Sequence, residues 1–464
     1  MSKTTGRLTR WAVAALGAMT LGALTVAPAS AQPNIDPDAT GSITVHKYEE
    51  PAEPTGLPND GTELDELTGL VPLEGVEFTL HQVEDIDLTT NDGWQAADGL
   101  TAQDVIDGSY TLGAPQALRT DVDGELVFGD LPVGVYLITE TDAGGNPISN
   151  AAAPFLVSIP LPDAANGWLY DVHVYPKNAV TNTSKEVDDA DAFGLGDTVT
   201  WTVNVDIPTL PADETFQRFG ISDTLDERLG YETVRVYVDE VELEEDVHYT
   251  VSFDAATNTV SVDFTEVGLT LIDASQGGAA AFEIDTEVLA IGDGVITNVA
   301  NVNVNDYEGE TNEVETRWGA VVIEKFAEAD GERAPLAGAE FQIFRSAADA
   351  AELADPVAVN GQTTFVSGED GRVTIEGLKE GEYWIVETEA PVGYVGTEEP
   401  IHVEVEAGSI AEAVVVEVEN SQRPPFELPL TGGMGTAAFL VGGLGLAGLA
   451  VGAGVRRQRA GRSA

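Results

Sequence analysis

The chain has 464 residues, a formal net charge of -59 and no cysteine. This charge excludes electrostatic binding to nucleic acid or to an anionic membrane surface, and the lack of cysteine excludes disulfides, thiolate metal sites and thiol catalysis. Many short runs rich in Val, Thr and Ile, with frequent Gly and Pro, predict an all-β fold of about three domains.

The N-terminal segment is typical of a secretory signal peptide. A basic start precedes an apolar run over residues 11–27, and Ala29-Ser-Ala31 supplies the small side chains of a cleavage site. This order predicts a signal peptide over residues 1–31 that is removed after Ala31. We therefore expect a secreted protein.

Residues 32–178 form the first predicted domain, in which apolar and polar residues alternate as in half-buried strands. Lys47 has the parity of the apolar residues around it, so a lysine lies where an apolar side chain is expected. Glu140 interrupts a later apolar face in the same way. The predicted strands cover residues 41–48, 73–80, 126–128, 134–141 and 168–178, and Asp123-Gly124 is typical of a hairpin turn.

The last of these stretches, Trp168–Asn178, ends in Tyr175-Pro176-Lys177. Pro176 has no N–H and cannot pair within a central ladder, and it holds Tyr175 extended. We therefore expect Lys177 to stand at the end of a strand, where its amine can meet another protein. From these residues alone, the alternative is an ordinary surface lysine.

Residues 319–421 repeat this pattern as a third predicted domain. Gly319–Phe326 matches Gly41–Tyr48, and the Asp-Gly turn with its following strand recurs between Asp370 and Thr388. Two copies of one β-sandwich fold are therefore predicted. The middle domain, residues 179–318, differs, and its predicted strands cover residues 183–187, 198–205, 219–225, 234–238, 249–253 and 296–304.

Each predicted domain places a lysine, a carboxylate and an asparagine at core-facing positions of different strands. Burying any one of these groups alone costs on the order of several kcal/mol, so we expect them to be paired or chemically altered. The sets are Lys47, Glu140 and Asn178 in the first domain, Lys185, Asp223 and Asn298 in the middle one, and Lys325, Glu387 and Asn420 in the third.

Burial lowers the pKa of a lysine toward the neutral amine and raises that of a carboxyl toward the protonated acid. A neutral amine beside an amide whose oxygen is hydrogen-bonded by a carboxylic acid can attack the carbonyl and expel ammonia, which forms a Lys–Asn isopeptide bond. The alternatives are a buried ion pair or residues that are in fact at the surface. Only five lysines follow the predicted signal peptide and only Lys379 lies outside the positions described, so these lysines are not scattered for solubility.

Residues 422–464 have three parts: Leu428-Pro-Leu-Thr431-Gly432, an apolar run to Val455, and a tail with four arginines. The run alone predicts a membrane span. The three parts together resemble the cell-wall sorting signal of sortase substrates. That resemblance implies cleavage between Thr431 and Gly432, with transfer of the threonyl group to an amine.

Two further motifs resemble those of sortase-assembled pilins of Gram-positive bacteria. Tyr383–Tyr394 (YWIVETEAPVGY) is similar to the family's E-box, and Trp168–Lys177 is similar to its pilin motif. With the sorting signal, the motifs follow the family order over essentially the whole chain, which most resembles the major, shaft-forming subunits of the SpaA/SpaH-like type. The resemblance implies tandem Cna-type Ig-like domains.

The resemblance also implies roles and partners. Lys177 would attack the acyl-enzyme formed on Thr431 of a neighbouring subunit, giving a covalent polymer on the cell surface. The implied partners are a pilin-specific sortase, identical subunits, minor or tip pilins, peptidoglycan and a host ligand that the sequence does not identify. The implied internal bonds are Lys185–Asn298 with Asp223 (A-type), Lys325–Asn420 with Glu387 (B-type) and Lys47–Asn178 with Glu140, the last being variable within the family.

Three other kinds of protein share some of these sequence features. A monomeric wall-anchored adhesin could use the same domains without needing Lys177, and a tip or basal minor pilin is a closer alternative. A secreted hydrolase would need a Ser/His/Asp or paired-carboxylate arrangement, which this sequence does not offer. The histidines show no metal-ligand spacing, and Asp121-Val-Asp-Gly124 is better explained as a turn than as a calcium loop, so we expect no metal or cofactor. We predict a fimbrial shaft subunit rather than an enzyme.

Overall fold

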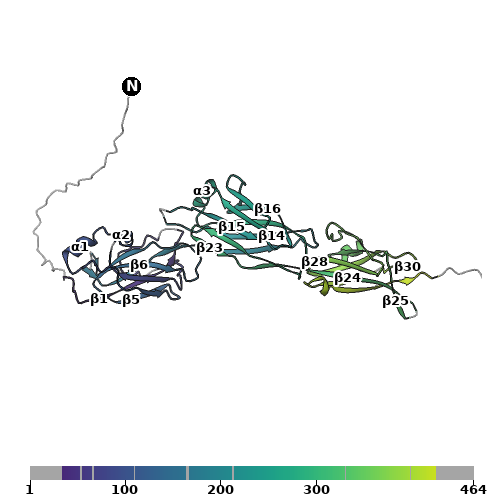
Figure 1. Cartoon of the computed structure of the whole chain (residues 1–464), viewed down its shortest axis with the longest axis horizontal. Helices are drawn as coiled ribbons and strands as arrows, with labels where there is room; N and C mark the ends of the chain where they lie inside the picture. The colour runs from purple at the N-terminus through teal and green to yellow at the C-terminus, as the bar shows by residue number, and fades with distance from the viewer. Residues whose placement is uncertain are drawn as a thin grey trace, which may run out of the picture. The chain divides into compact units, whose positions relative to one another are not determined.

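A computed structural model describes residues 34–424, apart from residues 53–54, 65–66, 109, 164–166, 212–213, 330 and 398. The predicted signal peptide with Ala31, and the C-terminal motif with Thr431 and Gly432, lie outside the described residues. The described chain consists mainly of strands with a few short helices, so the predicted all-β class is confirmed (Figure 1). Within the described ranges, no helix has both the length and the apolar character needed to cross a bilayer.

The chain divides into two compact units. The first contains the described residues up to Val180 together with Pro208–Glu214, and the second contains Thr181–Ile207 and the residues from Thr215 onward. The second unit therefore includes both the middle and the third predicted domains. Their separation at residue 318 stays a prediction.

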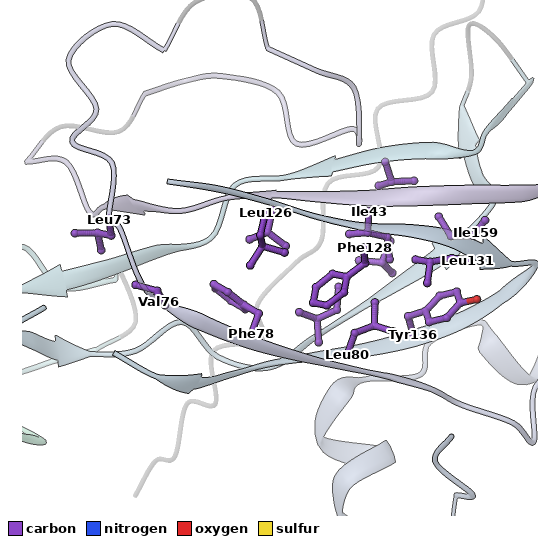
Figure 2. Close-up of a cluster of buried hydrophobic side chains, with 14 residues drawn as sticks. Ile43, Leu73, Val76, Phe78, Leu80, Leu126, Phe128, Leu131, Tyr136 and Ile159 are labelled. Carbon is purple, nitrogen blue, oxygen red and sulfur yellow. The ribbon is translucent and has the colours of Figure 1, made fainter. Parts of the chain in front are cut away.

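The first unit contains two sheets that enclose an apolar core. One sheet has the order β11-β1-β5 and the other β4-β3-β6-β8. Side chains from both sheets, including Ile43, Phe78, Phe128 and Tyr136, pack in one cluster between them (Figure 2). The strands are β1 (Thr40–His46), β3 (Glu77–Gln82), β4 (Gln116–Arg119), β5 (Glu125–Pro132), β6 (Gly134–Asp142), β8 (Phe155–Ile159) and β11 (Asp171–Val174).

The predicted closing strand over residues 168–178 is wrong as a single element, because the chain forms three short strands there. β10 (Gly167–Leu169) pairs with β9 (Leu161–Asp163), β11 pairs in parallel with β1, and β12 (Lys177–Val180) joins a separate sheet with β2 (Tyr48–Glu49) and β7 (Ile148–Asn150). Pro176 cannot donate to a ladder, and the break between β11 and β12 falls there.

Three further features of the first unit differ from the sequence-based expectation. The strand predicted from residue 73 begins only at Glu77, because the N–H of Leu73 donates to Lys47 O and the N–H of Val76 to Thr120 Oγ1. Two short helices, α1 (Asn91–Ala97) and α2 (Ala102–Asp107), were not predicted. Each begins after a threonine that caps its first turn.

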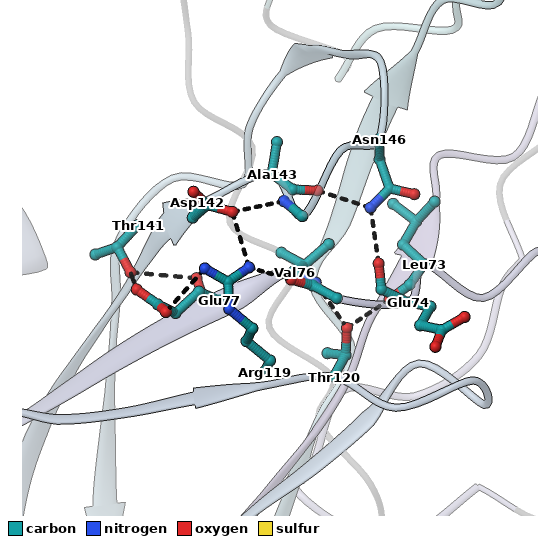
Figure 3. A network of polar contacts seen from close by, with 12 residues as sticks. Leu73, Glu74, Val76, Glu77, Arg119, Thr120, Thr141, Asp142, Ala143 and Asn146 are labelled. Carbon is teal, nitrogen blue, oxygen red and sulfur yellow. Dashed lines mark hydrogen bonds and ion pairs between the residues drawn. The ribbon is translucent and has the colours of Figure 1, made fainter.

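A polar network connects the end of β6 with β3 and β4. The Arg119 guanidinium contacts Asp142 Oδ1 at 2.9 Å, Glu77 Oε2 at 3.1 Å and the carbonyl oxygen of Gly75 at 2.8 Å (Figure 3). The Asn146 side chain donates to the carbonyl oxygen of Glu74 at 2.9 Å. These contacts fix the turn that follows β6, two residues beyond Glu140.

The middle part of the chain forms two five-stranded sheets with orders β13-β14-β20-β16-β17 and β18-β19-β15-β22-β23. Phe219 on β15 and Phe282 on β20 stack with ring centroids 6.5 Å apart, which places the two sheets face to face. The elements are β13 (Thr183–Asp188), β14 (Thr198–Asp206), β15 (Phe219–Thr224), β16 (Leu229–Val238), β17 (Val241–Glu242), β18 (Tyr249–Asp254), β19 (Thr259–Phe264), α3 (Glu266–Ala274), β20 (Ala279–Val288), β22 (Ala300–Val304) and β23 (Tyr307–Glu310).

The predicted strand over residues 296–304 is also wrong as a single element. Its first half is β21 (Val295–Asn298), which pairs with β24 (Val314–Ala329), whereas β22 pairs with β15. The chain therefore changes sheets after Asn298. β24 is one long strand, and it pairs with β21 near its start and with β28 (Arg372–Lys379) and β32 (Val414–Glu419) farther along.

The last part of the chain repeats the strand order of the first unit. β24 pairs in parallel with β32 and antiparallel with β28, as β1 does with β11 and β5. The facing sheet has the order β27-β26-β29-β31, equivalent to β4-β3-β6-β8. The remaining elements are β25 (Glu332–Pro335), β26 (Glu340–Phe344), α4 (Ala347–Glu352), β27 (Phe365–Val366), β29 (Gly381–Glu389), β30 (Tyr394–Val395), β31 (Ile401–Val405) and β33 (Ser421–Gln422).

Candidate cross-linking and assembly sites

The residues of the first predicted set meet in the core of the first unit. Lys47 follows β1, Glu140 lies on β6 of the opposite sheet, and Asn178 is the second residue of β12. Lys47 Nζ lies 3.0 Å from Glu140 Oε2 and donates to Asn178 Oδ1, and Asn178 Nδ2 donates to Glu140 Oε1 at 2.6 Å. Lys47 is 0% exposed and Asn178 is 1% exposed. The three groups therefore contact one another pairwise, away from solvent.

The middle set also comes together, from three different strands. Lys185 on β13 contacts Asp223 on β15, with Nζ and Oδ2 2.5 Å apart, and Asn298 Nδ2 lies 3.4 Å from the same oxygen. All three side chains are buried. The chain changes sheets directly after Asn298, which is how an asparagine near the end of β21 reaches an acid on β15.

The third set repeats the arrangement of the first. Lys325 Nζ on β24 is 3.2 Å from Glu387 Oε1 on β29, and Asn420 Nδ2, just beyond β32, donates to that oxygen at 2.7 Å. Phe341 is opposite Glu387 in the sheet, as Phe78 is opposite Glu140. The lysine and the acid therefore occupy equivalent positions in the two repeats.

The backbone around these two lysines is also repeated. The N–H of Lys47 donates to Gly124 O and that of Lys325 to Gly371 O. Gly124 and Gly371 have φ of 76° and 75°, and a Cβ on either would lie 2.5 or 2.4 Å from the lysine carbonyl oxygen. Each Asp-Gly turn therefore needs glycine, because it brings its backbone against the lysine.

Burial shifts the pKa of the lysine in each of the three sites. Desolvation lowers the pKa of Lys47 to about 8, against the opposing effect of Glu140. Burial likewise lowers the pKa of Lys185 and of Lys325 and raises the pKa of Asp223. Each shift moves the group toward its uncharged form, which for a lysine is the nucleophile.

One feature differs from the mechanism inferred from the sequence, in which the acid binds the amide oxygen. In all three sites the carboxylate contacts the amide nitrogen of the asparagine. That nitrogen is the atom that would leave as ammonia. The carboxyl group therefore contacts both the nitrogen that attacks and the nitrogen that leaves. It is placed to carry a proton from one to the other.

Lys177 is the first residue of β12 and is partly buried. Its amine makes no hydrogen bond or ion pair with any residue that the structure describes. The backbone on either side is held, because Tyr48 N–H donates to Pro176 O at 3.3 Å and Lys177 pairs with Tyr48 in parallel. The strand therefore presents a lysine whose main chain is fixed and whose amine is unpaired within the described chain.

Three further groups at these sites were missed by reasoning from sequence. The backbone N–H of Ala152 donates to Asn178 Oδ1 at 2.6 Å. The side chain of Asn312 binds the backbone of Lys185: Oδ1 accepts from the N–H at 2.8 Å, and Nδ2 donates to the carbonyl oxygen at 3.0 Å. His46, next to Lys47, lies 3.0 Å from Glu125 and 2.9 Å from His173. The contact between the two histidines could have been predicted from their positions on adjacent strands. A contact made by a backbone N–H could not, because it does not depend on residue type.

Comparison with known proteins agrees with this architecture. A family model described as the Gram-positive pilin subunit D1, N-terminal domain, matches residues 38–179, and a prealbumin-like fold domain of SpaA type matches residues 319–420. The fimbrial subunit type 2 of Actinomyces naeslundii is 32% identical to the chain, over 97% of this chain and 97% of that protein.

Two solved structures extend the likeness to three dimensions. The full-length major pilin SpaD of Corynebacterium diphtheriae is 30% identical, with a TM-score of 0.73 over 84% of this chain and 99% of that one. The major pilin SpaA of the same organism, whose structure points to a modular pilus assembly with stabilizing isopeptide bonds, is 25% identical, with a TM-score of 0.58 over 82% of this chain and 99% of that one.

These relatives are structural subunits of surface fimbriae and not enzymes, and pilins of this kind assemble with other pilin subunits. The likeness extends over nearly the whole chain. The chain belongs to the family of Gram-positive major pilins of SpaA type, the structural subunits of a pilus shaft.

Proposed function

We propose that each of the three buried sets forms a Lys–Asn isopeptide bond, namely Lys47–Asn178, Lys185–Asn298 and Lys325–Asn420. The observation that carries this proposal is that a buried carboxyl group lies within 3.4 Å of both the lysine amine and the asparagine amide in every set. A buried ion pair alone would not need an asparagine at the same place in all three. The relative SpaA, with its stabilizing isopeptide bonds, supports the same assignment.

The proposed chemistry moves one proton through the acid. The lysine attacks Cγ of the asparagine as the neutral amine, the form that burial favours, and the carbonyl π electrons move onto the oxygen. When the carbonyl re-forms, the bond from Cγ to Nδ2 breaks, and that nitrogen leaves as ammonia with a proton relayed by the carboxyl from the attacking nitrogen. One amide bond forms and one ammonia is lost at each site.

Assembly of the shaft is proposed to use different residues. A sortase cleaves between Thr431 and Gly432, and the threonyl group is passed to the amine of Lys177 on a neighbouring subunit. The position of Lys177, with a fixed backbone and an amine without a partner among the described residues, supports this role. The same chemistry would join the last subunit to the peptidoglycan and the minor or tip pilins to the shaft.

A denaturing immunoblot of cell-wall extracts tests the assembly step. We expect a detergent-resistant ladder from the unsubstituted protein and from Lys379→Ala, which removes a lysine elsewhere. Lys177→Ala and Lys177→Arg should leave monomer only, because neither offers a primary amine at that position. A ladder that persists in both Lys177 variants would contradict the assignment, and a single band in every strain would indicate an anchored monomer.

A further inference from the structure

The amide group of Asn178 is held from both ends. Its Nδ2 donates to Glu140 Oε1 at 2.6 Å, and its Oδ1 accepts the backbone N–H of Ala152 at 2.6 Å and a hydrogen bond from Lys47 Nζ. A backbone N–H can only donate, so the atom that faces Ala152 must be the oxygen. This contact fixes the orientation of the amide.

Resting on the cross-link proposed above, we infer that the backbone N–H of Ala152 is a catalytic group that stabilises the oxyanion of the Lys47–Asn178 reaction. When Lys47 Nζ bonds to Cγ of Asn178, the electron pair of the carbonyl bond moves onto Oδ1. The N–H of the partly buried Ala152 already points at that oxygen, and the asparagine that carries the oxygen is buried. When the pair returns, Nδ2 departs as ammonia on the side of Glu140. Fixed donors aimed at a developing negative charge act in this way in acyl-transfer sites.

In the described part of the chain, the other two sites have no such donor. Asn298 Oδ1 and Asn420 Oδ1 are buried and have no hydrogen-bond partner among the described residues. A buried carbonyl oxygen without a partner is uncommon, so the three sites differ in how the amide is activated. The first site has a donor on the oxygen as well as the acid on the nitrogen, whereas the other two have only the acid.

The fold places this N–H through strand pairing. β7 runs antiparallel to β12, with Asn150 opposite Ala179 and Ile148 opposite Val180. Because the two strands are antiparallel, the residues that follow Asn150 lie next to those that precede Ala179. Ala152 therefore lies beside Asn178. The start of this segment is anchored by the network around Arg119 and Asn146 after β6 (Figure 3).

Two substitutions separate the N–H from the side chain at this position. Ala152→Pro removes the N–H, and Ala152→Gly keeps it while removing the methyl group. In the chain from Gln32 to Thr431, which covers every described residue, a pulse of isotope-labelled synthesis followed by digestion and mass spectrometry measures each cross-linked peptide over time. We expect Ala152→Pro to slow formation of the Lys47–Asn178 peptide by about 10²-fold or more. Ala152→Gly should leave it near the unsubstituted rate.

The two other cross-links serve as internal controls, because no described residue supplies a counterpart of this N–H at either site. They should form at unchanged rates in both variants. If no cross-link forms even in the unsubstituted chain, the proposed chemistry itself fails. If all three form and Ala152→Pro does not slow the first, the catalytic role of the N–H is wrong while the chemistry stands.

Proline could also disturb the local backbone, so a second variant is needed. Replacing Ala152 by lactic acid turns its peptide N–H into an ester oxygen while keeping the shape of the chain. Slower cross-linking in this ester variant, with unchanged hydrogen exchange of the amides in β1 and β5, would support the inference. An unchanged rate in the ester variant would overturn it, whatever the proline variant does.

Discussion

Lys177 and Asn178 are adjacent residues with opposite surroundings. Asn178 is 1% exposed and contacts Lys47, Glu140 and Ala152, whereas Lys177 is partly buried and its amine has no partner among the described residues. Neighbouring residues of a strand point to opposite faces. One short strand, β12, can therefore supply an asparagine to the core and a lysine to another subunit.

Removing the acid should prevent the internal bond while changing the shape of the site little. We expect Asp223→Asn and Glu387→Gln each to retain one ammonia in the intact mass. Each should also lower the free energy of unfolding, by about 2–4 kcal/mol if the bond acts as a disulfide closing a long loop does. Glu419→Gln, an exposed carboxylate next to Asn420, is the matched control and should lose ammonia normally. Full ammonia loss in the acid variants would show that the carboxyl is not required.

The rate of the first cross-link should depend on pH through Lys47. Burial lowers the pKa of Lys47 to about 8, and only the neutral amine attacks. Below that value the neutral fraction rises about tenfold per pH unit, and above it the rate should level off. The time course of the Lys47–Asn178 peptide between about pH 6 and 9 measures this. A flat profile would mean that deprotonation of Lys47 does not limit the reaction.

The first unit should lose stability in mild acid because of His46. Burial lowers the pKa of this histidine, while Glu125 and Glu63 oppose the shift and His173 adds to it. The His46 ring stacks with those of His173 and Tyr175, at 5.2 and 4.6 Å between ring centroids. A lowered pKa means that the unfolded chain binds more protons, so the stability contributed by neutral His46 is present above about pH 6.5 and is lost as the pH falls below it.

Urea unfolding as a function of pH tests this behaviour. We expect His46→Phe to reduce the loss of stability below about pH 6.5, because phenylalanine keeps the stacking and cannot be protonated. His81→Phe is the comparison, since His81 is only partly buried and bonds to the carbonyl oxygen of Gly113 at 2.9 Å. Equal pH dependence in both variants would place the titration elsewhere.

The repeated Asp-Gly turn can be tested with a matched pair of glycines. Gly371 and Gly338 both have positive φ, at 75° and 81°, but a Cβ at Gly371 would lie 2.4 Å from Lys325 O whereas Gly338 has open space around it. Both alanine variants carry the backbone strain, and only Gly371→Ala must also displace the backbone of Lys325. We expect Gly371→Ala to lower the free energy of unfolding by at least about 1 kcal/mol more than Gly338→Ala and to slow the Lys325–Asn420 bond. Equal effects would mean that the turn does not position the lysine.

The lysine, acid and asparagine of each set were predictable because each interrupts an apolar face of a strand. The structure brings Lys325, Glu387 and Asn420 together as the pattern indicated. The break after Asn298 was not predictable, because Ile296, Asn298, Ala300 and Val302 are all buried on either side of it. Alternation reports burial and not which sheet a residue belongs to.

Other contacts at the sites could not be predicted, because no sequence pattern indicates them. The contact of Ala152 with Asn178 uses only the backbone, which every residue except proline shares. The side-chain oxygen and nitrogen of Asn312 both bind the backbone of Lys185, 127 positions earlier in the chain. Contacts over such separations follow from the assembled sheets. The helices α1 and α2 are too short for a 3.6-residue period to stand out.

The length of β24 has a consequence for pulling forces. In a shaft joined through Lys177 and Thr431, tension enters a subunit at Lys177 and leaves it at Thr431, so the backbone before Lys177 is not stretched. The Lys185–Asn298 and Lys325–Asn420 bonds would divert the load around the residues that each pair encloses.

The stretched backbone then consists of residues 177–185, 298–325 and 420–431. The middle stretch begins with the hairpin of β22 and β23 and ends in β24, which is hydrogen-bonded to β21 at its start and to β28 and β32 farther on. Strand backbone is already nearly fully extended. Under load such a subunit would lengthen chiefly by opening the β22–β23 hairpin, while the residues enclosed by the two bonds would be shielded from the tension.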